Sequence, residues 1–123
     1  MDAATKKTLV IGASEQTDRY SNRAARSLMR YGHTVELIGL RKGAIDNHPI
    51  QTGRPALQDI DTVTMYVGAR NQPDYYEYIR QLKPRRVIFN PGAENPEFEQ
   101  VLKQEGIEPL HACTLVMLSV GTY

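Results

Sequence analysis

The stretch Thr8-Leu9-Val10-Ile11-Gly12-Ala13-Ser14 is a run of apolar, mostly branched residues that ends in a glycine and two small residues. Continuous apolar runs of this kind are typical of a strand that is covered on both faces, as in a parallel sheet. We therefore expect a strand over Thr8–Ala13 and a loop from Ser14 onward. Gly12 lies where the chain has to turn tightly or approach a ligand closely, which a residue without a Cβ allows.

A helix and a second strand are expected next. Apolar residues recur at helical spacing at Ala24, Ala25, Leu28 and Met29. Ser21 or Asp18 can cap this helix, and Gly32 can end it. Residues 34–38 (TVELI) predict the second strand. Strand, helix and strand within about 30 residues make one βαβ unit.

The alternation of strands and helices continues to the end of the chain. Three more strands are expected over residues 62–67, 86–89 and 107–112. Asn71 and Asn95 can each cap a helix that has a proline in its first turn, where proline is tolerated. Residues 39–59 hold several glycines and prolines, so we expect a loop there, with room for one short strand near Ile50. An apolar tail covers residues 115–120.

This pattern predicts an α/β protein with a Rossmann-like, doubly wound, mostly parallel five-stranded sheet and helices on both faces. A length of 123 residues favours a single domain over residues 1–123. Hydrophobic residues make up 41% of the chain and charged residues 24%, which excludes an intrinsically disordered protein.

Charge and composition restrict the partners and the location. The formal net charge of +1 gives no reason to expect a nucleic-acid partner. The longest apolar stretches are far shorter than the roughly 20 residues of a membrane span. The N-terminus lacks the apolar core of a signal peptide. Cys113 is the only cysteine, so no internal disulfide can form. We expect a cytoplasmic protein that binds no membrane.

The loop after the first strand is the expected phosphate site. In open parallel sheets, ligands bind at the carboxyl ends of the strands where the strand order reverses. The N–H groups at the start of the following helix favour an anion there. Hydrogen-bonding and cationic side chains gather on this segment at Ser14, Arg19, Ser21, Asn22 and Arg23. The dinucleotide fingerprint G-x-G-x-x-G is absent, and Gly12 could simply turn the chain.

The exit of the second strand is basic. Domains that bind NAD usually place an acid there for the ribose hydroxyls, but the candidate Glu36 lies inside the strand. Arg41 and Lys42 stand at the exit instead, and two cations attract a phosphate on the adenosine ribose. This favours CoA or NADP over NAD. The alternative is that Arg41 and Lys42 form a solvated loop pair.

Other reactive or aromatic residues have simpler explanations. His111 and Cys113 could share a strand face, but a catalytic pair is less common than a small buried cysteine. The three histidines are scattered without ligand spacing, so no metal site is expected. Tyr75 and Tyr78 are expected in the core or in a subunit interface, and Tyr76 is expected to be exposed.

Several short motifs follow one another between about Thr8 and Leu118. They are Val10-Ile11-Gly12-Ala13-Ser14, Tyr20-Ser21-Asn22-Arg23-Ala24, Tyr31-Gly32-His33, Lys42-Gly43, Asn90-Pro91-Gly92, Glu94-Asn95-Pro96-Glu97 and Cys113. In this order and spacing the sequence resembles the small CoA-binding domain proteins, a Rossmann-like family. That family is related to the nucleotide-binding domain of the succinyl-CoA synthetase α subunit.

The resemblance implies a doubly wound domain that binds CoA. It assigns phosphate contacts to Gly12, Ala13, Ser14, Ser21, Asn22 and Arg23. It assigns the adenosine end to Lys42, with Arg41 beside it. It also assigns part of the groove to Val67, Gly68, Ala69 and Arg70. Two segments depart from the family pattern: Leu40-Arg41 replace an asparagine–proline pair, and Glu15-Gln16-Thr17 lack the usual proline.

Three functions follow as hypotheses. The leading one is a module that binds the nucleotide cofactor CoA or an acyl-CoA and has no catalysis of its own. The second is an NADP-dependent oxidoreductase or redox sensor, for which His111 and Cys113 are the available reactive groups. The third is a structural or regulatory interaction subunit that uses the tyrosine-rich helix and the apolar tail. A homodimer is compatible with all three.

Overall fold

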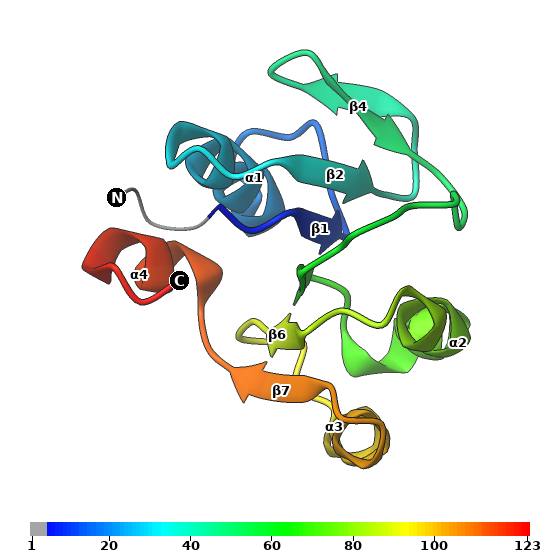
Figure 1. The fold of residues 1–123 in the computed structure, drawn as a ribbon. Helices are drawn as coiled ribbons and strands as arrows, with labels where there is room; N and C mark the ends of the chain where they lie inside the picture. The colour runs from blue at the N-terminus through cyan, green and yellow to red at the C-terminus, as the bar shows by residue number, and fades with distance from the viewer. Residues whose placement is uncertain (1–4) are drawn as a thin grey trace.

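Seven strands form one sheet in the computed structural model, which describes residues 5–123 (Figure 1). The strands are β1 (Thr8–Ile11), β2 (Val35–Ile38), β3 (Gly43–Ile45), β4 (His48–Gln51), β5 (Thr62–Met65), β6 (Arg86–Phe89) and β7 (Glu108–His111). Their order is β3-β4-β2-β1-β5-β6-β7. Neighbouring strands are parallel except β3 and β4, which pair in antiparallel fashion. The prediction of a doubly wound, mostly parallel sheet is confirmed.

The strand order reverses beside β1. The chain starts at β1, builds β2, β4 and β3 on one side, and then returns to place β5 on the other side of β1. β6 and β7 follow outward from β5. The carboxyl ends of β1 and β5 therefore flank the switch point, which is where this class of sheet binds ligands.

The sheet has more than the five strands expected, because residues 43–51 form a hairpin; its second strand, β4, is the short strand expected near Ile50. β3 and β4 pair through Ile45 and His48, and Asp46-Asn47 make the turn between them. Asp46 and Asn47 have φ values of 47° and 69°. Two-residue hairpin turns of type I′ require positive φ at both central residues, which Asp and Asn tolerate. The Asp-Asn pair was the signal for this hairpin, and the nearby glycines and prolines obscured it.

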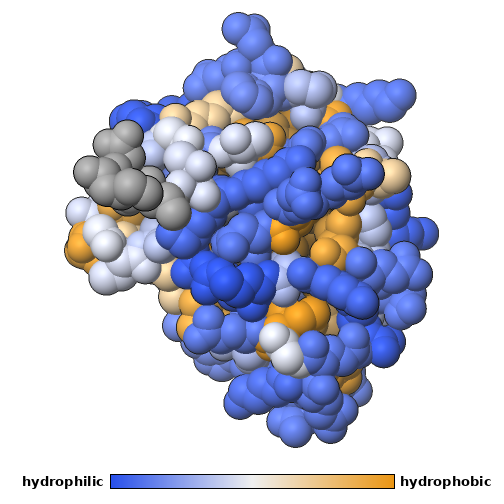
Figure 2. Space-filling view, viewed as in Figure 1, coloured by the Kyte–Doolittle hydropathy of each residue, from blue (hydrophilic) through white to orange (hydrophobic). Residues whose placement is uncertain are grey.

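Helices cover both faces of the sheet, as predicted (Figure 1). They are α1 (Tyr20–Arg30), α2 (Pro73–Leu82), α3 (Pro96–Gln104), α4 (Thr114–Val120) and a short 3-10 helix, η1 (Ala69–Asn71). α1 and α4 lie on one face, and α2 and α3 lie on the other. The apolar tail expected over residues 115–120 lies within α4. Val116 and Val120 of this helix are exposed. The face seen in Figure 2 is mainly hydrophilic, with hydrophobic patches near its centre.

The helix starts match the sequence only in part. Asn95 caps α3 as predicted, since its side chain accepts a hydrogen bond from the Phe98 N–H. α1 begins at Tyr20 with no side-chain cap, so neither Asp18 nor Ser21 has the capping role expected of it. Asn71 does not cap α2 either, because it lies within η1. None of the helices within residues 5–123 has the length and apolar character needed to cross a bilayer.

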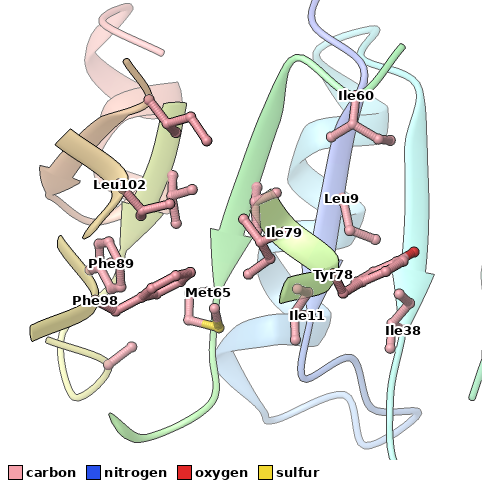
Figure 3. Close-up of a cluster of buried hydrophobic side chains, with 14 residues drawn as sticks. Leu9, Ile11, Ile38, Ile60, Met65, Tyr78, Ile79, Phe89, Phe98 and Leu102 are labelled. Atoms are coloured by element: carbon pink, nitrogen blue, oxygen red, sulfur yellow. The ribbon is translucent and has the colours of Figure 1, made fainter. Parts of the chain in front are cut away.

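Alternation along β1 divides the core in two. Leu9 and Ile11 point to the face covered by α2 and α3, where they pack with residues such as Ile79 and Phe98 (Figure 3). Val10 points to the face covered by α1 and α4. Successive side chains of a strand face opposite ways, so a strand that is apolar throughout has to be covered on both sides.

Two of the three tyrosines of α2 lie as expected. Tyr78 is buried, and Tyr75 packs against the core while staying half-buried. Tyr76 was expected to be exposed, but it is half-buried: its ring stacks on Phe98 with centroids 4.1 Å apart, and its hydroxyl accepts a hydrogen bond from Asn95. Tyr76 thus joins α2 to α3.

The first loop fits closely against the end of β2. A Cβ built on Gly39 would lie 2.3 Å from the carbonyl oxygen of Ala13. That oxygen belongs to the backbone, so it cannot move without shifting the loop. The close approach of the Ala13 carbonyl therefore requires a residue without a Cβ at position 39.

We predict that Gly39→Ala lowers the free energy of unfolding by about 1–3 kcal/mol, because overpacking forces the loop away from β2. Urea denaturation followed by circular dichroism measures the change. Gly68→Ala is the matched control, because its nearest neighbour is 3.9 Å away and its φ is not positive. The control should be neutral or slightly stabilising. If the two variants were equally stable, the close approach of Gly39 to the Ala13 carbonyl would not limit the residue at position 39.

Tyr66 carries a buried hydroxyl that has no hydrogen-bond partner among the described residues. The nearby hydroxyls of Thr64 and Thr114 bond to each other at 2.8 Å. Burial disfavours the charged phenolate and raises the pKa of Tyr66 well above its usual value, with a smaller contribution from Cys113. Burial likewise raises the pKa of Tyr78 to about 12.

We expect Tyr66→Phe to leave stability at pH 7 almost unchanged, because the hydroxyl makes no bond to lose. Above about pH 10 an unfolded tyrosine releases its proton while the folded one retains it, so the wild type loses stability as the pH rises. The variant should lose less stability between pH 10 and 11.5. Chemical denaturation across this pH series measures the difference.

Tyr78→Phe is the comparison variant for this series. Its hydroxyl donates to the carbonyl of Pro55 at 2.7 Å, so removing it should cost about 1 kcal/mol at pH 7. A large loss at pH 7 in Tyr66→Phe, or an unchanged alkaline slope, would contradict the assignment.

Candidate functional site

A cavity of about 440 Å³ opens at the carboxyl edge of the sheet. Residues that follow β1, β5, β6 and β7 line it, together with the start of α1. They are Gly12, Ser14, Arg19, Tyr20, Ser21, Tyr66, Asn90, Pro91, Gly92, Ala93, Cys113 and Leu115. The cavity therefore lies beside the switch point, where the sequence placed the ligand.

The first loop is wedged between the strands on either side of it. The N–H groups of Gly12 and Ala13 both donate to the carbonyl of Ile38 at 2.9 Å. Gly12 has a φ of +98°, and a Cβ there would lie 3.0 Å from the Tyr66 carbonyl oxygen. Gly12 thus turns the chain, as the simpler explanation held, and it also forms part of the cavity wall.

Polar side chains hold the rest of this loop in place. Asn22 is buried, and its amide donates to the Ser14 carbonyl at 2.8 Å. Arg26 donates to the Asn22 side chain at 2.7 Å and to the Thr17 carbonyl at 3.1 Å. The Ser14 hydroxyl accepts the Gln16 N–H at 3.1 Å. These bonds hold the loop against α1.

The start of α1 faces the cavity. Arg19 precedes the helix, is exposed, and donates to the Gln16 side chain at 3.0 Å. Tyr20 is 66% exposed, and the Arg23 guanidinium lies 5.4 Å from its ring centre. Since no side chain caps this helix, its first N–H groups can meet an anion.

The structure separates the predicted site residues into groups. Gly12, Ser14, Arg19 and Ser21 line the cavity. Ala13 and Asn22 are buried behind it and support the loop. The remaining predicted residues are exposed and lie outside the cavity: Arg23, Arg41, Lys42, Gly68, Ala69 and Arg70. Arg41 and Lys42 stand in the turn between β2 and β3, and the last three stand at η1.

Sequence reasoning missed Tyr20, Tyr66 and Leu115 as cavity residues. Tyr66 directly follows β5, so its position after an apolar run was an available signal. Leu115 could not be found this way, because the tail was not recognised as a helix that lies near the strand ends.

A buried network around Asn90 fixes one wall of the cavity. The Asn90 amide donates to the Thr64 hydroxyl at 2.7 Å and to the Met65 carbonyl at 2.9 Å. The Asn90 oxygen accepts the Thr114 N–H at 2.9 Å. These bonds tie β5, β6 and the start of α4 together. They hold Cys113 and Leu115, the neighbours of Thr114, in the wall.

A second buried amide, that of Gln72, fixes the loops after β5 and β6. Gln72 donates to the carbonyls of Val67 and Ala93 at 2.8 and 2.7 Å. Its own oxygen accepts the Asn95 amide at 2.9 Å. The loop after β5 and the loop after β6 are therefore joined, which positions Ala93 at the cavity.

His111 and Cys113 do not form the pair considered from the sequence. His111 is exposed and its Nε2 lies 2.6 Å from a carboxylate oxygen of Glu99, whereas Cys113 lines the cavity. The partner of the histidine is thus an acid of α3. Over residues 5–123 no group of three or more metal-ligating side chains comes together.

Comparison with known proteins relates this geometry to solved structures. An uncharacterized protein of known crystal structure is 49% identical, with a TM-score of 0.96 over 98% of this chain and 100% of that one. A Thermus thermophilus protein, cell-free ID.343, is 20% identical, with a TM-score of 0.85 over 97% and 91% of the two chains.

A larger enzyme contains a similar fold. The dinucleotide forming acetyl-coenzyme A synthetase 1 of Ca. Korarchaeum cryptofilum is 14% identical, with a TM-score of 0.70 over 86% of this chain and 25% of that one. At such low identity, this enzyme and the Thermus protein are evidence for the fold alone.

The sequence comparisons identify the family. No curated protein sequence matches the chain. A family model described as a CoA binding domain matches residues 6–119, which include every strand and every residue that lines the cavity. With this match, the doubly wound sheet and the cavity at its switch point, the chain belongs to the CoA binding domain family.

Proposed function

We propose that this protein is a single-domain module that binds coenzyme A or an acyl-CoA and performs no chemistry on it. The observation that carries the proposal is the cavity at the switch point, bounded by the Gly12 loop and the uncapped start of α1. The family match supports the ligand class.

The diphosphate end is assigned to the first loop. The uncapped N–H groups of α1 and the guanidinium of Arg19 supply positive charge at one end of the cavity. Ser14 and Ser21 supply short hydrogen-bond donors. Phosphates are recognised by such combinations of a helix N-terminus, an arginine and hydroxyl groups.

The pantetheine arm is assigned to the body of the cavity. Its walls include the ring of Tyr66 and the apolar side chains of Ala93 and Leu115. A flexible arm with apolar segments and amides suits a cleft of this character. Cys113 also lines the cavity, so an arm bound there should shield its thiol from reagents.

The adenosine end is assigned to the turn that holds Arg41 and Lys42, outside the cavity. Both side chains are exposed, which leaves them free to meet a ribose phosphate. The proposal gives Cys113 no catalytic role, because His111, the histidine that could have activated it, faces Glu99 instead.

We predict that calorimetric titration finds CoA bound more tightly than dephospho-CoA or NADP. In the double variant Arg41→Ala/Lys42→Ala, the Kd for CoA should rise by about tenfold or more, because charge-assisted hydrogen bonds to the ribose phosphate are lost. Dephospho-CoA should bind the variant and the wild type alike. Lys103→Ala, which removes a cation from the last turn of α3, is the control.

Three outcomes of this titration separate the hypotheses. Equal CoA affinity in the double variant and the wild type would remove Arg41 and Lys42 from the site. A preference for NADP would favour the oxidoreductase or redox sensor. Failure of every nucleotide to bind would overturn the proposal and leave the interaction subunit as the best explanation.

A second prediction concerns Cys113, the only cysteine. Saturating acetyl-CoA, which has no free thiol, should slow alkylation of Cys113 by iodoacetamide several-fold, measured by intact mass. Adenosine 3′,5′-bisphosphate, which lacks the pantetheine arm, should give little protection. Equal rates with and without acetyl-CoA would show that the arm lies elsewhere.

A further inference from the structure

The carboxylate of Glu15 reaches from the first loop to β3. The N–H of Ala44 donates to its Oε2 at 2.9 Å. Glu15 follows Ser14 in the loop at the end of β1, and Ala44 lies in the edge strand. The contact therefore bridges the loop assigned to the diphosphate and the turn assigned to the adenosine end.

Gly43 makes room for this carboxylate. A Cβ at Gly43 would lie 2.3 Å from the Glu15 Cδ and 2.7 Å from its Oε1. Any other residue would push the side chain of Glu15 away. The carboxylate therefore lies against the backbone of β3 at Gly43, where the chain has no side chain.

The position that Glu15 occupies is suited to an anion. Arg41 and Lys42 directly precede Gly43, so two cationic residues and a main-chain N–H follow one another in the chain. Exposed backbone N–H groups beside cations are characteristic anion sites. Here the protein's own carboxylate accepts the Ala44 N–H.

We propose that Glu15 is a specificity-determining residue that limits how much a phosphate on the adenosine ribose contributes to binding. This inference rests on the proposed function, since it assumes that the ribose phosphate approaches Arg41 and Lys42. The carboxylate competes with the phosphate for the Ala44 N–H and repels it by charge. A ligand without that phosphate does not compete for the Ala44 N–H, so Glu15 opposes its binding less.

The measured quantity is the discrimination ratio, defined as the Kd of dephospho-CoA divided by the Kd of CoA. In Glu15→Ala this ratio should rise about tenfold over the wild type, because the like charge that competes with the ribose phosphate for the Ala44 N–H is removed. The gain should come mainly from tighter CoA binding, with a smaller change in the affinity for dephospho-CoA. Calorimetric titration of both ligands measures both constants.

Asp18→Ala is the matched control. Asp18 lies in the same loop and is exposed, so this variant removes one negative charge and leaves the bond from Ala44 to Glu15 in place. Its discrimination ratio should stay within about twofold of the wild type, since exposed charges at a distance are screened.

Gly43→Ala tests the same idea without removing the charge. The added Cβ meets the flexible end of Glu15, so the side chain is displaced while the strand is kept. Its discrimination ratio should rise, though by less than that of Glu15→Ala. Circular dichroism confirms that each variant is folded.

The outcomes decide both claims separately. A raised ratio in Glu15→Ala and Gly43→Ala, with none in Asp18→Ala, supports the specificity role. CoA binding with an unchanged ratio in Glu15→Ala, or an equal rise in Asp18→Ala, overturns the role and leaves the proposed function standing. If neither the wild type nor any variant binds CoA, both the proposed function and this role are wrong.

Discussion

The close packing of the first loop between β2 and β5 is the constraint on which the rest of the structure depends. Gly12 lies against the backbone of Tyr66, and Gly39 lies against the carbonyl of Ala13. A side chain at either glycine would separate the loop from a strand end. Because the loop is held at the switch point, the start of α1 is aimed at the carboxyl edge of the sheet, and the cavity opens where the strand order reverses.

Buried amides extend this order to the other side of the cavity. The side-chain amides of Asn90 and Gln72 donate to backbone carbonyls and to the Thr64 hydroxyl. The Gln72 oxygen also accepts a hydrogen bond from the Asn95 amide. A buried polar group is costly unless it is paired, so each network specifies one arrangement of its loops. The walls of the cavity are therefore positioned by residues whose polar groups are already satisfied, which leaves ligand recognition to the first loop, the helix start and the exposed cations.

Charge is divided along the carboxyl edge. The cavity has largely apolar walls, and the cations Arg41 and Lys42 lie outside it, in the turn between β2 and β3. Glu15 places one carboxylate beside that turn, on the N–H of Ala44. This distribution suits a long ligand with an apolar arm and a charged nucleotide end. It also makes the nucleotide end the place where a single side chain can alter selectivity.

The sequence by itself determined the order of strands and helices, the parallel sheet and the edge on which a ligand is expected, because apolar runs, helical spacing and Asn-Pro starts are local signals. It also identified Gly12, Ser14, Arg19 and Ser21, which line the cavity. Only the tertiary structure decided the roles of Asn22, Tyr66 and Leu115, since burial and cavity lining depend on residues distant in the chain. The Asp46-Asn47 turn was a local signal for the β3–β4 hairpin, but the pairing of β4 with β2 and the bond between Glu15 and Ala44 join separate segments, so the packing of the whole sheet decided them.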